Sequence, residues 1–214
     1  MIYYLPSCKF KAGFPDTSKK LQAFLSSEGV TITGCCKPSQ KMFAEGDTVL
    51  NNCCTCALIT EEKSPFVTSR SIYEYLLDDP AFPWPDYGGE RITVQDCWRA
   101  RDHRAEQEAI RECMRRMNIV PVELAENFEK AEFDGTWRFA PKIMQEKFAP
   151  VAFGEINRTG IIPVPEEEWE QRMREHVSQY TTDRVVCYCN ACLTGVKLGG
   201  ANGVHILELA AARL

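Results

Sequence analysis

The sequence of this 214-residue chain predicts the same order of elements twice: a strand, then a cysteine, then a helix. Residues 2–5 read as a short buried strand before Cys8, and Leu21 follows on a helix. Residues 91–94 repeat the strand before Cys97, and Ile110 follows at the same separation. Near the end of each half, a strand leads into Cys-x-x-Cys, as Cys53/Cys56 and Cys189/Cys192. The repetition indicates two related halves.

Strands alternating with helices predict an α/β fold in which each half has a short parallel sheet. Residues 1–79 form the first half in this interpretation. The stretch 80–90, rich in proline and glycine, is the expected linker, and 91–214 form the second half, with an insertion of little regular structure near 140–165. Strands are expected at 2–5, 30–33, 48–50, 91–94, 120–124 and 185–186, and helices at 17–28, 69–78, 102–117, from Pro165 onward and at 204–213.

Composition narrows the class of protein. The net charge of −5 gives no general attraction to nucleic acid. The chain start lacks the features of a signal peptide, and no apolar run approaches the ~18 residues of a membrane span. We therefore expect a cytoplasmic protein with no nucleic-acid partner and no direct membrane insertion. Eleven cysteines in a reducing compartment indicate metal or redox chemistry rather than disulfides.

Five cysteines of the first half follow predicted strands in three groups. These are Cys8, the adjacent pair Cys35 and Cys36, and the pair Cys53 and Cys56. The carboxyl ends of parallel strands share one edge of a sheet, so the five thiols are expected to converge. Soft thiolates select iron–sulfur clusters or zinc. Zinc takes four ligands, whereas a cluster of several irons has use for five.

The second half has a poorer set. We expect a second metal site from Cys97, Cys187, Cys189 and Cys192, but this half has no adjacent cysteine pair. Asp134 lies nearest to the missing pair by position. A zinc ion or a four-ligand cluster with Cys187, Asp134 or His103 as the fourth ligand, and a site that is empty, all remain open at this point.

The first-half pattern Cys-x26-Cys-Cys-x16-Cys-x-x-Cys resembles the cysteine-rich CCG domain of the heterodisulfide reductase B subunit family. The likeness covers nearly the whole chain except about 138–180, and two copies are usual in that family. It implies a 4Fe-4S type cluster on the five first-half cysteines. It also implies other redox subunits as partners and a small thiol or disulfide as substrate. The sequence departs from the family in that Lys37 follows the pair, the next gap is short, and Cys54 and Cys113 have no counterparts.

Three functions follow from these patterns. The first is an iron–sulfur redox subunit that transfers electrons or reduces a disulfide within a larger complex. Because no flavin fingerprint is present, its electrons would come from another chain. The second is a zinc-binding structural or accessory protein, and the third is a thiol–disulfide oxidoreductase that uses Cys189 and Cys192. No catalytic residue is assigned. The arginines between 99 and 116 are expected to form a salt-bridged helix face, with a docking surface for an acidic partner as the alternative. Cys113 is expected in the core.

Overall fold

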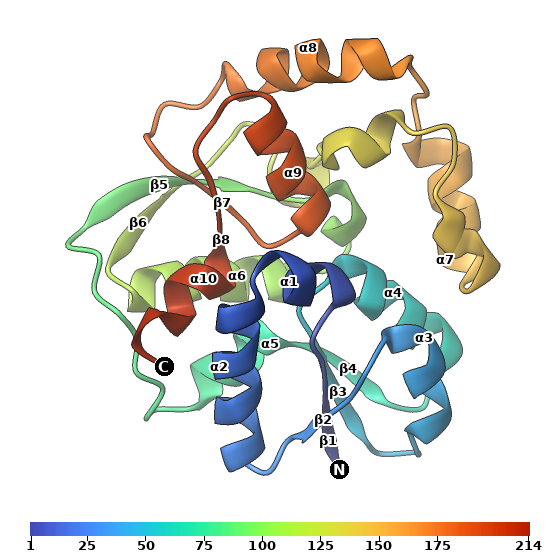
Figure 1. Cartoon of the computed structure of the whole chain (residues 1–214), viewed down its shortest axis with the longest axis vertical. Coiled ribbons are helices and arrows are strands. Elements are labelled where there is room, and N and C mark those ends of the chain that lie inside the picture. Colours follow the sequence, from blue (N-terminus) through green and yellow to red (C-terminus); the bar gives the residue numbers. More distant parts are fainter.

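The computed structural model describes all 214 residues, and its first half alternates short strands with helices (Figure 1). A 3₁₀ turn, Gln40–Met42, follows α3. The helices and strands of this half, in chain order, are β1 (Ile2–Leu5), α1 (Cys8–Gly13), α2 (Pro15–Ser27), β2 (Thr31–Ile32), α3 (Cys36–Ser39), β3 (Thr48–Asn51), α4 (Cys54–Lys63), β4 (Thr68–Ser71) and α5 (Ile72–Asp78).

The second half lies above the first in Figure 1 and ends at the C-terminus beside the first half. Its helices and strands are β5 (Glu90–Gln95), α6 (Arg104–Arg116), β6 (Ile119–Val122), α7 (Pro150–Glu155), α8 (Glu166–Val177), β7 (Val185–Cys187), α9 (Asn190–Leu198), β8 (Gly203–His205) and α10 (Ile206–Ala210). Short 3₁₀ or π turns lie at Trp98–Ala100, Phe128–Lys130, Gly135–Phe139, Met144–Lys147, Ile156–Gly160 and Ala211–Arg213.

Each half is built on a sheet of four strands that pair only in parallel. The strand orders are β2-β1-β3-β4 and β6-β5-β7-β8. The first strand of each half therefore pairs with the second and the third, and the fourth lies at an edge. The two halves have the same topology, and the prediction of an α/β fold with two related parallel sheets is confirmed.

Alternate residues of the first sheet face different cores, because side chains along a strand alternate between its two faces. Tyr4 and Leu50 belong to a large core that also contains Val94 and Val186 of the second half. Tyr3 and Val49 face the opposite side, in a smaller core to which α3, α4 and α7 contribute. The large core therefore joins the two halves across one face of the first sheet.

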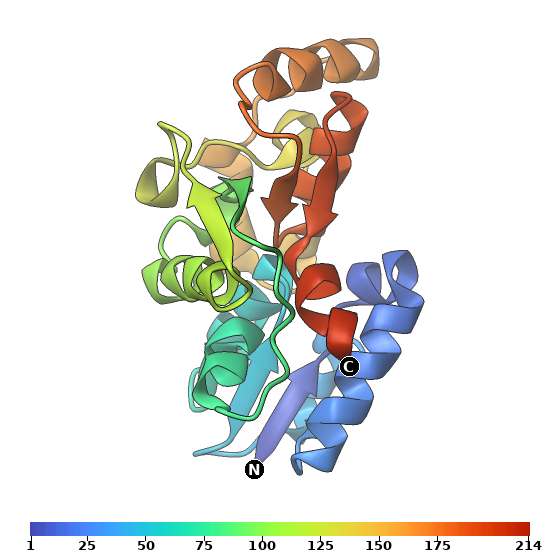
Figure 2. The same ribbon diagram turned by 90° about the vertical axis from the view of Figure 1, so that its left-hand side faces the viewer.

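The C-terminal end of the chain adds to this joint. Helix α10 lies beside α1 and α2 in both views (Figure 2). The ring of His205 packs against that of Phe10, with centroids 4.6 Å apart. The hydroxyl of Tyr87, which precedes β5, donates to the carbonyl of Leu209 at 3.1 Å. The last residues of the chain thus pack on its first helices.

The structure differs from the predicted elements at the same place in both halves. A helix (α4 or α9) opens at each Cys-x-x-Cys and was not predicted, and a strand (β4 or β8) then precedes the last helix of the half. Strand β4 reads Thr-Ser-Arg-Ser, so it has no apolar alternation to identify it. The stretch 140–165, where little regular structure was expected, contains the short helix α7 between two short turns. Pro150 occupies the first turn of α7, where proline is tolerated.

Candidate metal-binding sites

The five cysteines of the first half lie at three neighbouring strand ends. Cys8 opens α1 just after β1, the pair Cys35 and Cys36 begins α3 after β2, and Cys53 precedes α4 directly after β3. Cys56 lies in the first turn of α4, on the same helix face as Cys53. All five line one cavity of about 230 Å³. We call them the first thiol set.

The thiols of the first thiol set act on one another, and Cys56 lowers the pKa of both Cys36 and Cys53. The neighbouring thiol of Cys56, together with the nearby charge of Arg99, lowers the pKa of Cys53 to about 6 against the effect of burial. Cys53 therefore carries thiolate character at neutral pH, which is the form that binds metal ions. Cys8 is exposed and Cys36 and Cys56 are buried, so the set runs from the surface inward.

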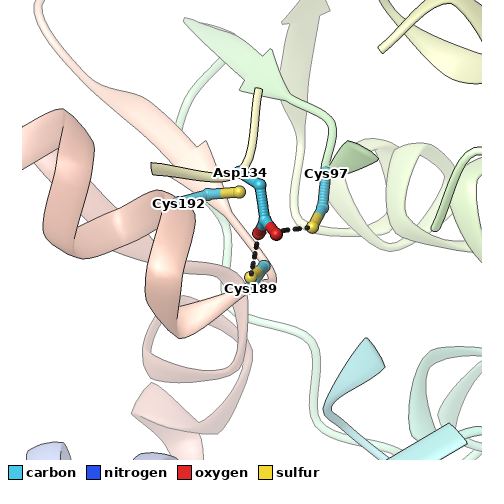
Figure 3. Close-up of side chains that lie close together, drawn as sticks. All are labelled: Cys97, Asp134, Cys189 and Cys192. Atoms are coloured by element: carbon cyan, nitrogen blue, oxygen red, sulfur yellow. Dashed lines mark hydrogen bonds between the residues drawn. The ribbon is translucent and has the colours of Figure 1, made fainter. Parts of the chain in front are cut away.

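A second group converges in the second half (Figure 3). Cys97 follows β5, Cys189 caps α9 after β7, Cys192 lies in the first turn of α9, and Asp134 precedes the turn Gly135–Phe139. One ligand atom from each lies within 4.8 Å of the others, and all four residues are buried. The Cys97 thiol donates to Asp134 Oδ1 at 3.4 Å. We call these four residues the second group.

Of the three alternatives for a fourth member of the second group, the structure selects Asp134. Cys187, which was also expected at this site, lies within β7, where it pairs with His205 of β8 and packs in the large core. It is the last residue of β7, two residues before Cys189, and it is not part of the group. His103 instead contacts Glu61 at 3.0 Å, and this partner raises its pKa.

Arg99 lies between the first thiol set and the second group. Its guanidinium donates to both oxygens of Asp134 at 2.8 Å, and its Nη2 also donates to Cys189 Sγ at 3.1 Å. Its Nη1 donates to Thr55 Oγ1 at 2.5 Å, inside the Cys53–Cys56 turn. Arg99 was expected on a salt-bridged helix face, and it does form an ion pair, but its side chain is only 2% exposed and lies in the turn Trp98–Ala100. A buried carboxylate holds it there.

The cavity of the first thiol set has a positive wall. Lys9, Lys37 and Arg99 line it, and no carboxylate does. The ammonium of Lys9 lies 5.4 Å from the ring centre of Trp137, which also lines the cavity. Cations near thiols favour the thiolate form and offset the charge of a bound anionic group. The cavity therefore suits thiolate ligation and negatively charged contents.

Gly135 allows Asp134 to reach the second group. Its φ is +54°, and a Cβ atom built there would lie 2.0 Å from the carbonyl oxygen of Ala191, between Cys189 and Cys192. The turn Gly135–Phe139 and α9 touch at this point, so only glycine fits. Gly46 has a φ of +83° and open space around it. A substitution at Gly46 would therefore cause backbone strain, as at Gly135, but no steric clash.

We expect Gly135→Ala to lower the free energy of unfolding by about 1–3 kcal/mol more than Gly46→Ala does, which is the usual cost of overpacking. Urea unfolding of the two variants and the unmodified chain measures this difference. Equal destabilisation in both variants would contradict the close approach of the two backbone segments.

Comparisons of the chain with protein-family models, curated proteins and solved structures find no match in any of the three. None of the helices combines the length and the hydropathy that crossing a membrane would require. Any assignment of function therefore depends on the chemistry of the two thiol-rich groups.

Proposed function

We propose that this chain is an iron–sulfur redox subunit that transfers electrons or reduces a disulfide within a larger complex. In this proposal the first thiol set holds a 4Fe-4S type cluster. The resemblance of its cysteine pattern to the CCG domain supports the same function. The protein would work in the cytoplasm, where its eleven free cysteines stay reduced.

The observation that carries the proposal is the convergence of five thiols from three chain segments on one cavity. A single zinc ion uses four ligands, so a fifth thiol, from the adjacent pair Cys35 and Cys36, favours a centre with several metal atoms. Thiolate ligands favour iron–sulfur clusters among such centres. The donor set therefore fits a cluster.

The cavity also fits a redox role. Cys8 is exposed and Cys35 is partly exposed, so a small thiol or disulfide can approach the sulfur atoms from solvent. Lys9, Lys37 and Arg99 favour a negatively charged cluster or substrate. When bound, the cluster would supply the electron transfer, and the chain would supply the thiolate ligands, the positive surroundings and the opening.

The other two functions have weaker support. A thiol–disulfide oxidoreductase needs an attacking sulfur that a substrate can reach, but Cys189 is 5% exposed and Cys192 is fully buried. A closed, buried group with three thiols suits a structural metal site, in which cysteine ligands predominate. The zinc function is therefore assigned to the second group, as a companion to the cluster and not as the main activity.

Iron content tests the proposed function. Protein purified without oxygen is expected to be brown and to contain iron and acid-labile sulfide. The variants Cys35→Ser and Cys36→Ser should each lose most of the iron and the visible absorption, because each removes a thiolate ligand. Cys113→Ser is the matched control, since Cys113 is a buried thiol outside both groups, bonded to the carbonyl of Tyr73 at 3.7 Å.

Two outcomes would overturn the proposal. One is unmodified protein that binds only zinc under anaerobic conditions. The other is iron and a spectrum that stay unchanged in both variants of the adjacent pair. Circular dichroism of each variant shows whether the fold is retained, so that loss of iron is assigned to the ligand and not to unfolding.

A further inference from the structure

Cys54 was assigned to neither set from the sequence, yet it lies against the second group. It is the first residue of α4 and is buried, directly after Cys53. Successive helical residues turn by about 100°, so Cys54 points away from the side on which Cys53 and Cys56 meet the first cavity. Its side chain belongs to the large core, together with Cys97, Cys189 and Cys192.

Cys97 and Cys189 act on Cys54 as neighbouring side chains, and they act on Cys192 in the same way. Four buried thiols, those of Cys54, Cys97, Cys189 and Cys192, therefore gather at one place in the large core. A tetrahedron with Zn–S bonds of ~2.3 Å has edges of ~3.8 Å. The thiols of Cys97, Cys189 and Cys192 lie within 4.8 Å of one another, about 1 Å more than this edge, so a small contraction would bring these three to the size of the site.

Asp134 is a poorer ligand in this setting. Both of its oxygens already accept hydrogen bonds from the Arg99 guanidinium at 2.8 Å. Direct metal binding by Asp134 would compete with its ion pair to Arg99. Because Arg99 is buried, no water is present to replace the lost carboxylate partner. Carboxylates in such positions commonly support a metal site from outside by accepting or orienting hydrogen bonds. Of the four thiols, only Cys189 accepts from Arg99, through a single hydrogen bond of 3.1 Å, and a thiolate sulfur keeps further lone pairs for a metal ion.

We propose that Cys54, Cys97, Cys189 and Cys192 form a four-thiolate site for a single divalent ion of the zinc class, with Asp134 and Arg99 as its supporting ion pair. Three ligands come from the second half and the fourth comes from α4 of the first half. The ion therefore connects the two halves at the point where the first cavity begins. Cys53 and Cys54, adjacent in the chain, then serve two different metal sites.

This site refines the zinc part of the proposed function and does not depend on iron in the first thiol set. Its test accordingly uses a chain in which that set is disabled by Cys8→Ser, Cys35→Ser and Cys36→Ser. Cobalt(II), added alone, serves as the probe because tetrahedral thiolate coordination gives intense visible bands. The background chain is expected to bind one equivalent with these bands.

Three further substitutions in that background separate the roles. Cys54→Ser should weaken cobalt binding by more than about 100-fold, because it removes a ligand. Asp134→Asn should weaken it by about 10–100-fold, the usual effect of changing a supporting partner. Cys113→Ser should leave it unchanged. The proposal is wrong if Cys54→Ser binds cobalt as the background does, if Asp134→Asn has the larger effect, or if the background binds no cobalt.

X-ray absorption of the zinc-loaded background chain gives a readout that needs no variant of Cys54. Four sulfur neighbours at about 2.3 Å are expected. Three sulfur neighbours with one oxygen at about 2.0–2.2 Å would assign the fourth position to Asp134 and overturn the proposal. Neither measurement involves iron. Failure of this proposal would therefore say nothing about a cluster on the first thiol set, which the iron measurements test separately.

Discussion

Arg99→Met is expected to lower the free energy of unfolding by about 3–5 kcal/mol, since it leaves a buried carboxylate without its partner. Arg99 and Asp134 are each 2% exposed and share two hydrogen bonds of 2.8 Å. Methionine retains the length of the side chain and removes the charge. In a chain of this size, the loss corresponds to a fall of roughly 6–20 °C in the midpoint of thermal unfolding.

The loss should depend on pH in a definite direction. Burial raises the pKa of Asp134 to about 6 even though Arg99 opposes the shift. Because this pKa is higher in the folded state than in the unfolded state, the stability linked to Asp134 is present at low pH and lost as pH rises through the folded pKa. Without Arg99 the folded pKa rises further. We therefore expect Arg99→Met to be less destabilised at pH 4 than at pH 8.

A double variant separates the unpaired charge from lost packing. Arg99→Met combined with Asp134→Asn removes both charges and should recover a large part of the stability, because replacing both members of a buried pair costs far less than removing one. Arg101→Met is the exposed control, and its effect should stay within about 0.5 kcal/mol. If Arg99→Met is as stable as Arg101→Met at pH 8, the inference that Arg99 and Asp134 form a stabilising buried pair is wrong.

Arg111→Met is expected to cause a loss of similar size, about 3–5 kcal/mol, in the other buried ion pair of the second half. The Arg111 side chain is 1% exposed and donates to both oxygens of Asp96, at 3.1 and 2.8 Å. It also donates to both oxygens of Glu123, at 2.8 and 2.7 Å. Asp96 is fully buried and in turn accepts from the amide of Phe128 at 2.8 Å. Removing Arg111 thus affects the ends of β5 and β6 together.

The same helix supplies the control for this prediction. Arg115 lies one turn further along α6, is exposed, and pairs only with Glu112. Arg115→Met should change stability by less than about 0.5 kcal/mol. Urea unfolding compares the two variants. If both lose the same small amount, the ion pair of Arg111 with Asp96 does not stabilise the fold as inferred.

Arg99 and Arg111 also show why the salt-bridged helix face predicted for residues 99–116 was only partly right. Alternating charges along α6 do form surface pairs, such as Arg104 with Glu108. The spacing of arginines along the chain is the same whether the partner of each is a neighbour on the helix or a buried carboxylate at the end of a strand. Arg111 meets Asp96 only because β5 ends where α6 passes, and no local pattern records that contact.

Long elements with clear periodicity were predictable, and short ones were not. The predicted helices at 17–28 and 102–117 match α2 and α6 within a few residues. The predicted strand at 2–5 matches β1. Strand β4 is polar and β8 has three residues, so both take their conformation from the neighbouring strand and not from their own side chains. Helix α4, which begins at the first Cys-x-x-Cys, is only weakly amphipathic, so it was missed for want of an apolar face.

The duplicated order of strands, cysteines and helices was enough to determine two parallel sheets and the meeting of the first thiol set at one sheet edge. That inference succeeds because the carboxyl ends of neighbouring parallel strands are close whatever the loops contain. The iron–sulfur cluster stays a prediction. Only the tertiary structure decided that Asp134, and not Cys187, completes the second group, and that Arg99 and Cys54 reach it. These contacts arise where the two halves pack on a shared core, and packing between distant segments depends on shape complementarity that no spacing along the chain encodes.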